Sequence, residues 1–188
     1  MTDQISATTA PGVLLLTGEI HIGKTTVCRS VIAAAQHRGW RVAGLLSPTV
    51  LDSVGERVAV EMIDLSTNRT RTLARLDRKL NGPRLGPYHF DARTLTWGHN
   101  VVARAIARGC DLLVIDEIGR LELEQDAGLD VVPLLASNAL PLSVFVVRSP
   151  LLQLFHQKLP GVATMQFEIT LDNRAAASAQ VARLLGLP

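Results

Sequence analysis

The chain has 188 residues, of which 47% are hydrophobic, 19% charged and only 4% aromatic, and its formal net charge is +2. This length and composition predict a globular protein with a core of Leu, Val, Ile and Ala, and argue against intrinsic disorder. The small net charge and the lack of a basic run argue against nucleic acid as a partner, and no apolar run approaches the roughly 20 residues of a membrane span.

The N-terminal residues 1–10 are polar and contain no apolar signal-peptide core. We therefore expect a flexible tail over residues 1–10, followed by a single domain over residues 11–188. Cys28 and Cys110 are far apart and form no C-x-x-C pair, so two reduced thiols are expected rather than a disulfide framework or a metal site. Together these features predict a cytoplasmic protein, and leave a protein partner and the oligomeric state open.

The first predicted elements are a short apolar strand at 13–16 and a glycine-rich loop behind it. The pattern G-x-x-x-x-G-K-[ST] of a phosphate-binding loop is matched by Gly18, Glu19, Ile20, His21, Ile22, Gly23, Lys24, Thr25 and Thr26. Glycines let backbone N–H groups turn toward phosphate oxygens, the lysine reaches the β- and γ-phosphates, and the first threonine binds Mg²⁺. Apolar residues then recur at helical spacing until Gly39, so the loop lies between a strand and a helix, as this motif requires.

The middle of the chain predicts a β-rich insertion. A second strand is expected at 41–46, followed by a hairpin from the runs at 58–64 and 70–74. Residues 75–87 are basic and rich in Gly and Pro, which is typical either of a solvated loop or of a mobile segment over a nucleotide. A short strand is expected at 89–92, and a helix from near Thr94 to Gly109 that contains Trp97 and His99.

The second strong signal is the apolar strand at 112–115, which ends in Asp116 and Glu117. Ligands of open α/β sheets bind outside the carboxyl ends of the strands, so these acids should emerge near the phosphates. This is the Walker B pattern. Asp116 would hold Mg²⁺ through water, and Glu117 would face the attacking water.

The C-terminal third continues the alternation of helices and strands. Helices are expected at 130–137 and 151–158, and strands at 142–147 and 165–169. Asn173 could cap a final helix in which Ala177, Val181 and Leu184 share a face. The sequence thus predicts an α/β protein with the three-layer α/β/α fold of a P-loop NTPase, a mostly parallel central sheet and a β-hairpin insertion.

The acidic strand end continues into the longer stretch D-E-I-G-R-L-E-L at 116–123. This stretch is close to the D-E-I-G-K-M-E-L motif of the thermophilic and cancer-related nucleoside triphosphatases, a family that the chain resembles. Three further stretches, at 44–47, 84–88 and 170–174, resemble family motifs in the same order, so the resemblance covers nearly the whole chain. Two departures are His21, where the family has glycine, and Pro87 before Tyr88.

The resemblance implies Mg²⁺-dependent hydrolysis of the β–γ bond of nucleoside triphosphates with broad base tolerance. We assign catalytic roles to Lys24, Glu117 and Arg148, with Thr25 and Asp116 at the metal. Asn173 and Arg174 are added to the nucleotide site by resemblance, and Arg84 and Arg174 remain alternatives to Arg148. A small nucleotide or metabolite kinase, or a nucleotide-dependent adaptor with slow hydrolysis, would use the same loop.

Overall fold

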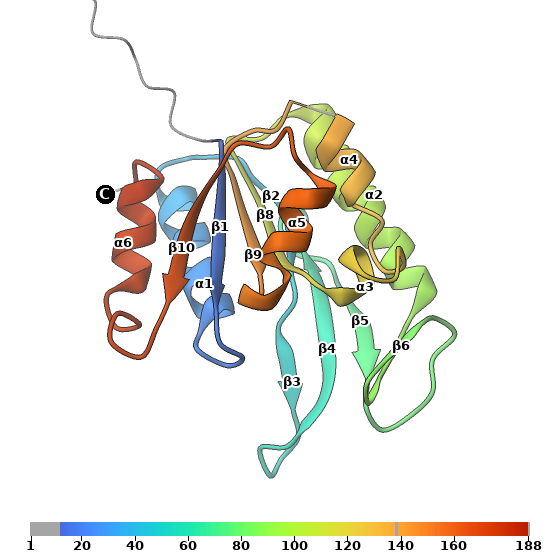
Figure 1. Cartoon of the computed structure of the whole chain (residues 1–188). Helices are drawn as coiled ribbons and strands as arrows, with labels where there is room; N and C mark the ends of the chain where they lie inside the picture. The colour runs from blue at the N-terminus through green and yellow to red at the C-terminus, as the bar shows by residue number, and fades with distance from the viewer. Residues whose placement is uncertain (1–11, 138, 188) are drawn as a thin grey trace, which may run out of the picture.

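The computed structural model describes residues 12–137 and 139–187 (Figure 1), so the tail expected at 1–10 lies outside the described residues. Within these ranges, ten strands form one sheet in the order β10-β1-β9-β8-β2-β4-β5-β7-β6, and β3 pairs with β4. The strands from β10 to β2 are parallel to their neighbours, and those beyond β2 are antiparallel. The sheet therefore has a parallel half and an antiparallel half.

The parallel half is built from near-continuous apolar runs. Its strands are β1 (Val13–Gly18), β2 (Val42–Leu46), β8 (Leu112–Ile118), β9 (Ser143–Val147) and β10 (Thr164–Ile169). Every position of β1, β2 and β9 is buried, because helices cover both faces of these strands. β10 lies at the edge, and all its positions except Ile169 are half-buried or exposed.

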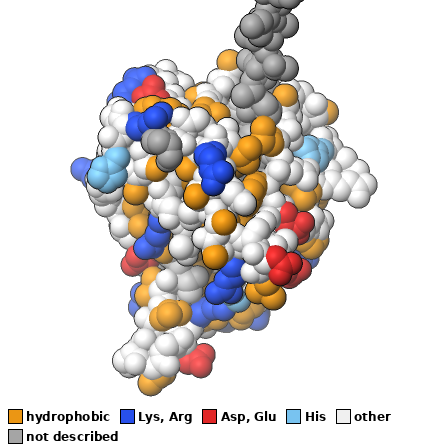
Figure 2. Space-filling model, turned by 90° about the vertical axis from the view of Figure 1, so that its left-hand side faces the viewer, with side chains coloured by type: hydrophobic (Ala, Val, Ile, Leu, Met, Phe, Trp, Pro, Cys, Tyr) orange, Lys and Arg blue, Asp and Glu red, His pale blue; other side chains and the backbone are white. Residues whose placement is uncertain are grey.

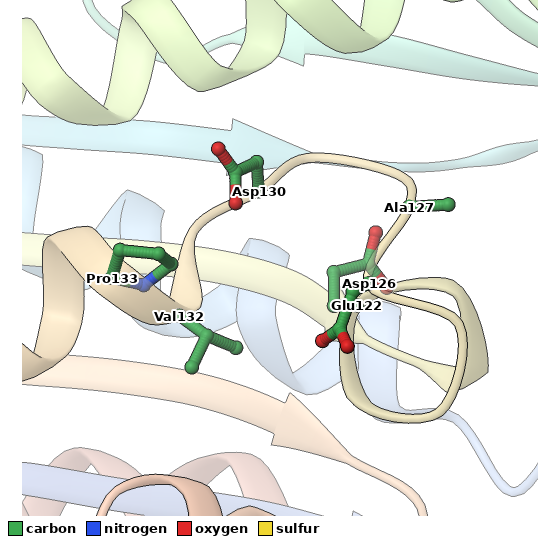
Figure 3. A pocket seen from close by; sticks show the side chains of 6 residues that line it. All are labelled: Glu122, Asp126, Ala127, Asp130, Val132 and Pro133. Carbon is green, nitrogen blue, oxygen red and sulfur yellow. The ribbon is translucent and has the colours of Figure 1, made fainter.

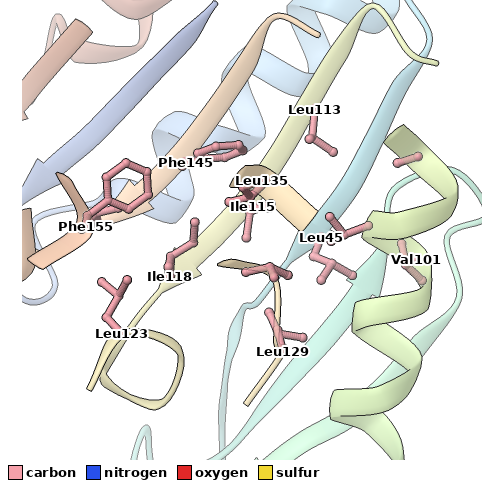
Figure 4. Close-up of a cluster of buried hydrophobic side chains, with 14 of the residues drawn as sticks. Leu45, Val101, Leu113, Ile115, Ile118, Leu123, Leu129, Leu135, Phe145 and Phe155 are labelled. Atoms are coloured by element: carbon pink, nitrogen blue, oxygen red, sulfur yellow. The ribbon is translucent and has the colours of Figure 1, made fainter. Parts of the chain in front are cut away.

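Helices cover both faces of the parallel half (Figure 1). They are α1 (Lys24–His37), α2 (Ala92–Arg108), α3 (Arg120–Leu123), α4 (Val132–Ser137), α5 (Leu152–Lys158) and α6 (Ala177–Leu184), with a 3-10 turn, η1 (Ser149–Leu151). Alternate residues of a strand enter different clusters: Leu14 and Val114 pack with α1 and α6, whereas Leu113 and Ile115 pack with α2, α4 and α5 (Figure 4). This is the expected three-layer α/β/α arrangement.

The antiparallel half is larger than the predicted hairpin. Its strands are β3 (Thr49–Leu51), β4 (Arg57–Asp64), β5 (Thr70–Arg75), β6 (Arg84–Leu85) and β7 (Tyr88–Phe90). The hairpin of β4 and β5 is confirmed by antiparallel pairing, such as that of Ile63 with Thr70. β3 was not predicted, because three residues are too few to show an alternating pattern, and its pairing with β4 creates it.

Some predicted boundaries were wrong. The strand expected at 89–92 is β7, and α2 begins at Ala92 rather than near Thr94, because the Asp91 side chain caps the helix by accepting a hydrogen bond from the Thr94 N–H. Asn173 does not cap α6, which begins after Ala176. Leu184 is 43% exposed and does not share the buried face.

Candidate active site

The phosphate-binding loop connects β1, which ends at Gly18, with α1, which begins at Lys24. Gly18 has φ 130°, and a Cβ atom there would lie 2.4 Å from the carbonyl oxygen of Ile169 on β10. Gly23 has φ 114°, a conformation that side-chain-bearing residues rarely adopt. Both glycines of the motif are therefore required by the backbone.

Lys24 folds over the start of the loop. Its Nζ donates hydrogen bonds to the carbonyl oxygens of Gly18 at 2.8 Å and Glu19 at 2.6 Å. Burial lowers the pKa of Lys24, and the negative charge of Glu117 opposes this shift. The structure thus brings together the lysine and the acidic strand end that the sequence assigned to one site.

Asp116 is the buried acid of this pair, with 4% of its surface exposed. Its carboxylate accepts a hydrogen bond from the Ser47 N–H at 3.2 Å, and the Thr25 hydroxyl lies close to it. Burial raises the pKa of Asp116 to about 6, and the contacts with Ser47 and Thr25 counteract part of that effect. The Thr25 contact joins the phosphate-binding loop directly to the end of β8.

Glu117 forms an ion pair with Arg148, whose Nε lies 2.5 Å from the Glu117 Oε1. Arg148 directly follows β9, the strand between β1 and β8, so the pair lies at the carboxyl ends of adjacent strands. Glu117 has φ 95°, which is strained for a residue other than glycine. Such strain is typical of positions held by a functional constraint.

His21, the departure from the family pattern, occupies a left-handed backbone position with φ 67°. Glycine would adopt this conformation without strain, which explains why glycine suits the position. Desolvation lowers the pKa of His21, and the positive charge of Arg57 is the strongest electrostatic contribution in the same direction. The charges of Lys24 and Arg148 act likewise, so His21 lies among cations.

The other assigned residues are placed differently. Gly18 pairs with Ile169, which puts the turn after β10 next to the loop. Within that turn the Asn173 amide accepts from the Thr170 N–H at 2.9 Å and donates to the Glu168 carbonyl at 2.8 Å. Arg174 is exposed, and its nucleotide role, like that of Asn173, stays a prediction.

Arg84 lies outside this arrangement. It belongs to β6, at the opposite end of the strand order from the strands that carry the loop. Its Nε donates to the Gly86 carbonyl at 2.9 Å. Of the three candidate arginines, Arg148 is therefore the one that the fold joins to an acidic site residue.

Two supporting groups were not assigned a role from the sequence. Ser47 holds Asp116 through a backbone N–H, which no residue pattern reveals. Glu122 is 8% exposed and accepts hydrogen bonds from the N–H groups of Gly119 at 2.9 Å and Leu129 at 3.1 Å. It fixes the turn after β8 and lines a cavity of about 260 Å³ whose wall also includes Asp126 and Asp130 (Figure 3).

Comparison with known proteins identifies the family. The sequence model of a family described as NTPase matches residues 13–182, most of the chain. The chain belongs to this NTPase family. A nucleoside-triphosphatase THEP1 from Methanopyrus kandleri is 33% identical over 175 residues, which cover 91% of this chain and 93% of that protein. The corresponding protein of Methanosarcina barkeri is 31% identical over 163 residues, covering 85% and 87% of the two chains.

Solved structures show the same fold. A human cancer-related nucleoside triphosphatase superposes with a TM-score of 0.70 at 22% identity, covering 91% of this chain and 95% of that one. THEP1 from Aquifex aeolicus gives a TM-score of 0.69 at 20% identity, covering 92% and 98% of the two chains. The α/β fold with a mixed, largely parallel sheet is thereby confirmed for this member of the NTPase family. Among the described residues, no helix is long and apolar enough to cross a membrane.

Proposed function

We propose that the protein is a Mg²⁺-dependent nucleoside-triphosphatase, which hydrolyses the bond between the β- and γ-phosphates of triphosphates such as ATP and GTP. The observation that carries this proposal is the meeting of the phosphate-binding loop with the acidic strand end, where the Thr25 hydroxyl lies close enough to Asp116 to lower the pKa of its carboxyl group. Membership of the NTPase family, and the names of the two relatives, support the same reaction.

The loop supplies most of the phosphate contacts. Backbone N–H groups from Glu19 to Thr26 hold the β-phosphate, and the first turn of α1 adds unpaired N–H groups. Lys24 exchanges its two carbonyl partners for phosphate oxygens and neutralises charge on the departing γ-phosphate. Positioning and charge stabilisation provide most of the catalysis in phosphoryl transfer.

Thr25 and Asp116 suit Mg²⁺ as ligands, since both offer oxygen atoms and Asp116 would act through water. In the described residues, no group of three or more His, Cys, Asp and Glu side chains is arranged to hold a metal. A cation that takes one or two protein ligands and completes its shell with phosphate and water therefore fits this site. When bound, Mg²⁺ supplies positive charge to the phosphate oxygens.

Glu117 acts on the attacking water, and Arg148 acts on Glu117 and the γ-phosphate. Glu117 orients the attacking water and accepts its proton as the new bond to phosphorus forms. Arg148 holds that carboxylate through its Nε, which leaves the other guanidinium N–H groups for the γ-phosphate. The proton passes from Glu117 to solvent after the phosphate has left.

The test is a panel of nucleoside triphosphates with Mg²⁺, in which released phosphate and remaining diphosphate are measured without any acceptor. We expect phosphate release from several nucleotides, and its loss in Lys24→Ala. Transfer that needs an added hydroxyl acceptor would instead indicate a kinase. Turnover that stays very slow until cell extract is added would indicate an adaptor whose hydrolysis a partner controls.

A further inference from the structure

The hairpin of β3 and β4 leaves the sheet beside the active site. β2 ends at Leu46, the next N–H, that of Ser47, binds Asp116, and β3 begins at Thr49. Both strands extend past the carboxyl ends of the parallel strands, toward the edge that carries the loop between β1 and α1 (Figure 1). The same edge is low in Figure 2, where Lys and Arg side chains gather next to Asp and Glu side chains above the projecting hairpin.

Arg57 stands at the outer end of this hairpin. It is the first residue of β4 and lies opposite Leu51 of β3 in the strand register. Its side chain is exposed, and it takes part in none of the ion pairs formed between described residues. The nearby Asp52 is engaged in the turn, where its carboxylate accepts the N–H groups of Val54 and Glu56.

The hairpin carries Arg57, the first residue of β4, past the carboxyl ends of the parallel strands, at the sheet edge where the phosphate-binding loop lies (Figure 1). The positive charge of Arg57 lowers the pKa of His21 in the loop, as do the charges of Lys24 and Arg148. Cations from three elements therefore lie near the loop: Lys24 on α1, Arg148 after β9 and Arg57 on the hairpin. Of these, Arg148 is already paired with Glu117. Lys24 and Arg57 take part in none of the ion pairs between described residues, so an anionic ligand that reaches both would be attracted by their charges.

We propose that Arg57 is a further catalytic residue. The hairpin belongs to the same chain and brings Arg57 to the terminal phosphate of the bound nucleoside triphosphate. This inference rests on the proposed hydrolysis of nucleoside triphosphates. Arginine suits the role because its planar fork of N–H donors matches phosphate oxygens. An arginine that touches the γ-phosphate stabilises charge in the transition state and distinguishes triphosphate from diphosphate.

The test compares Arg57→Ala, Arg57→Lys and the matched control Arg69→Ala. Arg69 is also exposed but lies in the turn at the opposite end of β4. We expect Arg57→Ala to lower kcat for ATP at least about 10-fold, a modest share of what an arginine finger contributes. It should also weaken binding of the β,γ-imido analogue of ATP more than binding of ADP. Arg57→Lys should recover part of both effects, and Arg69→Ala should match the wild type.

The outcomes separate this inference from the function on which it rests. If Arg57→Ala behaves like Arg69→Ala in both kcat and the preference for the analogue over ADP, the role of Arg57 is overturned and the hydrolase stands. If the wild type binds the analogue but releases no phosphate, hydrolysis is overturned, and the comparison of the analogue with ADP still decides the role of Arg57. A wild type that binds neither nucleotide overturns both.

Discussion

The parallel and antiparallel halves of the sheet differ in burial and in the kind of functional group that each supplies. β1, β2 and β9 are buried throughout, whereas β3 and the first half of β5 are largely exposed. Asp116, Glu117 and Arg148 lie at or just beyond the ends of buried strands, and Lys24 begins the helix that follows β1 and its loop. Groups whose chemistry needs fixed geometry are therefore carried by the rigid half of the molecule.

The antiparallel half of the sheet supplies exposed charged side chains rather than a buried framework. Arg57 projects from an exposed hairpin, and the positively charged Arg71 lies over the ring of Trp97 on α2. A strand with one solvated face accepts charged residues that a strand buried on both faces could not. The difference suggests that the parallel half determines stability and the basic reaction, while the antiparallel half modulates binding and rate.

The largest difference between the halves should appear in stability. Leu113 of β8 is 0% exposed, whereas Leu51 of β3 is 55% exposed. Leu113→Ala should destabilise the protein by about 2–5 kcal/mol, because it removes buried methyl groups and leaves a cavity. The same change at Leu51 should cost less than about 0.5 kcal/mol. Urea unfolding of both variants measures the contrast, and equal costs would show that the hairpin contributes to the core.

The parallel half was also the part that the sequence predicted best. Its strands are apolar runs bounded by turn residues, and the carboxyl ends of such strands share one edge. From the sequence, that rule predicts that Lys24, Thr25 and Asp116 lie together with Glu117 next to them, as the structure places them. It also selected Arg148, because a residue that directly follows a central strand must emerge at the same edge.

What the sequence did not reveal depends on contacts between distant segments. β3 exists only through its pairing with β4, and Ser47 supports Asp116 through a main-chain N–H that every residue type except proline offers. Asparagine is a favoured residue at the start of a helix, yet the amide of Asn173 stabilises the turn after β10 instead. Short polar side chains can satisfy several kinds of turn, so local propensity cannot choose between them.

Within the parallel half, Glu117→Gln should keep nucleotide binding and lower turnover at least about 100-fold, the scale of losing a general base. Glutamine keeps the size of the side chain but cannot take a proton from water. Glu61→Gln, on β4, is the matched control and should turn over normally. Phosphate release and the affinity for the β,γ-imido analogue measure the two effects. Unchanged turnover in Glu117→Gln would remove this residue from the mechanism.

Two carboxylates, one on α3 and one in the segment after β5, should affect stability in opposite senses as the pH changes. Burial raises the pKa of Glu122, so its contribution to stability is full below its unfolded pKa of about 4.3 and is lost as pH rises through the folded value. Asp77 is exposed, and its hydrogen bond with Arg75 lowers its pKa to about 2, so its contribution is present above about 3.9 and is lost as pH falls toward 2.

Urea unfolding at pH 7 and pH 5 tests this contrast. Glu122→Gln should cost about 1–3 kcal/mol at pH 7, because the amide nitrogen must face one of the two backbone N–H groups that the carboxylate binds. The deficit should grow at pH 5, where the wild type gains stability by protonating Glu122. The stability of Asp77→Asn relative to the wild type should be the same at both pH values. If the stability deficit of Glu122→Gln shrinks at pH 5, burial does not raise the pKa of Glu122.

The smallest effect is expected where the antiparallel half meets α2. The guanidinium carbon of Arg71 lies 4.8 Å from the ring centroid of the half-buried Trp97. Arg71→Gln should cost about 0.5–1 kcal/mol, the usual contribution of a cation–π contact at an exposed site. Arg69→Gln, an exposed arginine of the neighbouring turn, should cost nothing measurable. If the two variants unfold at the same urea concentration, the ring contact adds no stability, and β5 is attached to α2 through its buried residues Leu73 and Ala74 alone.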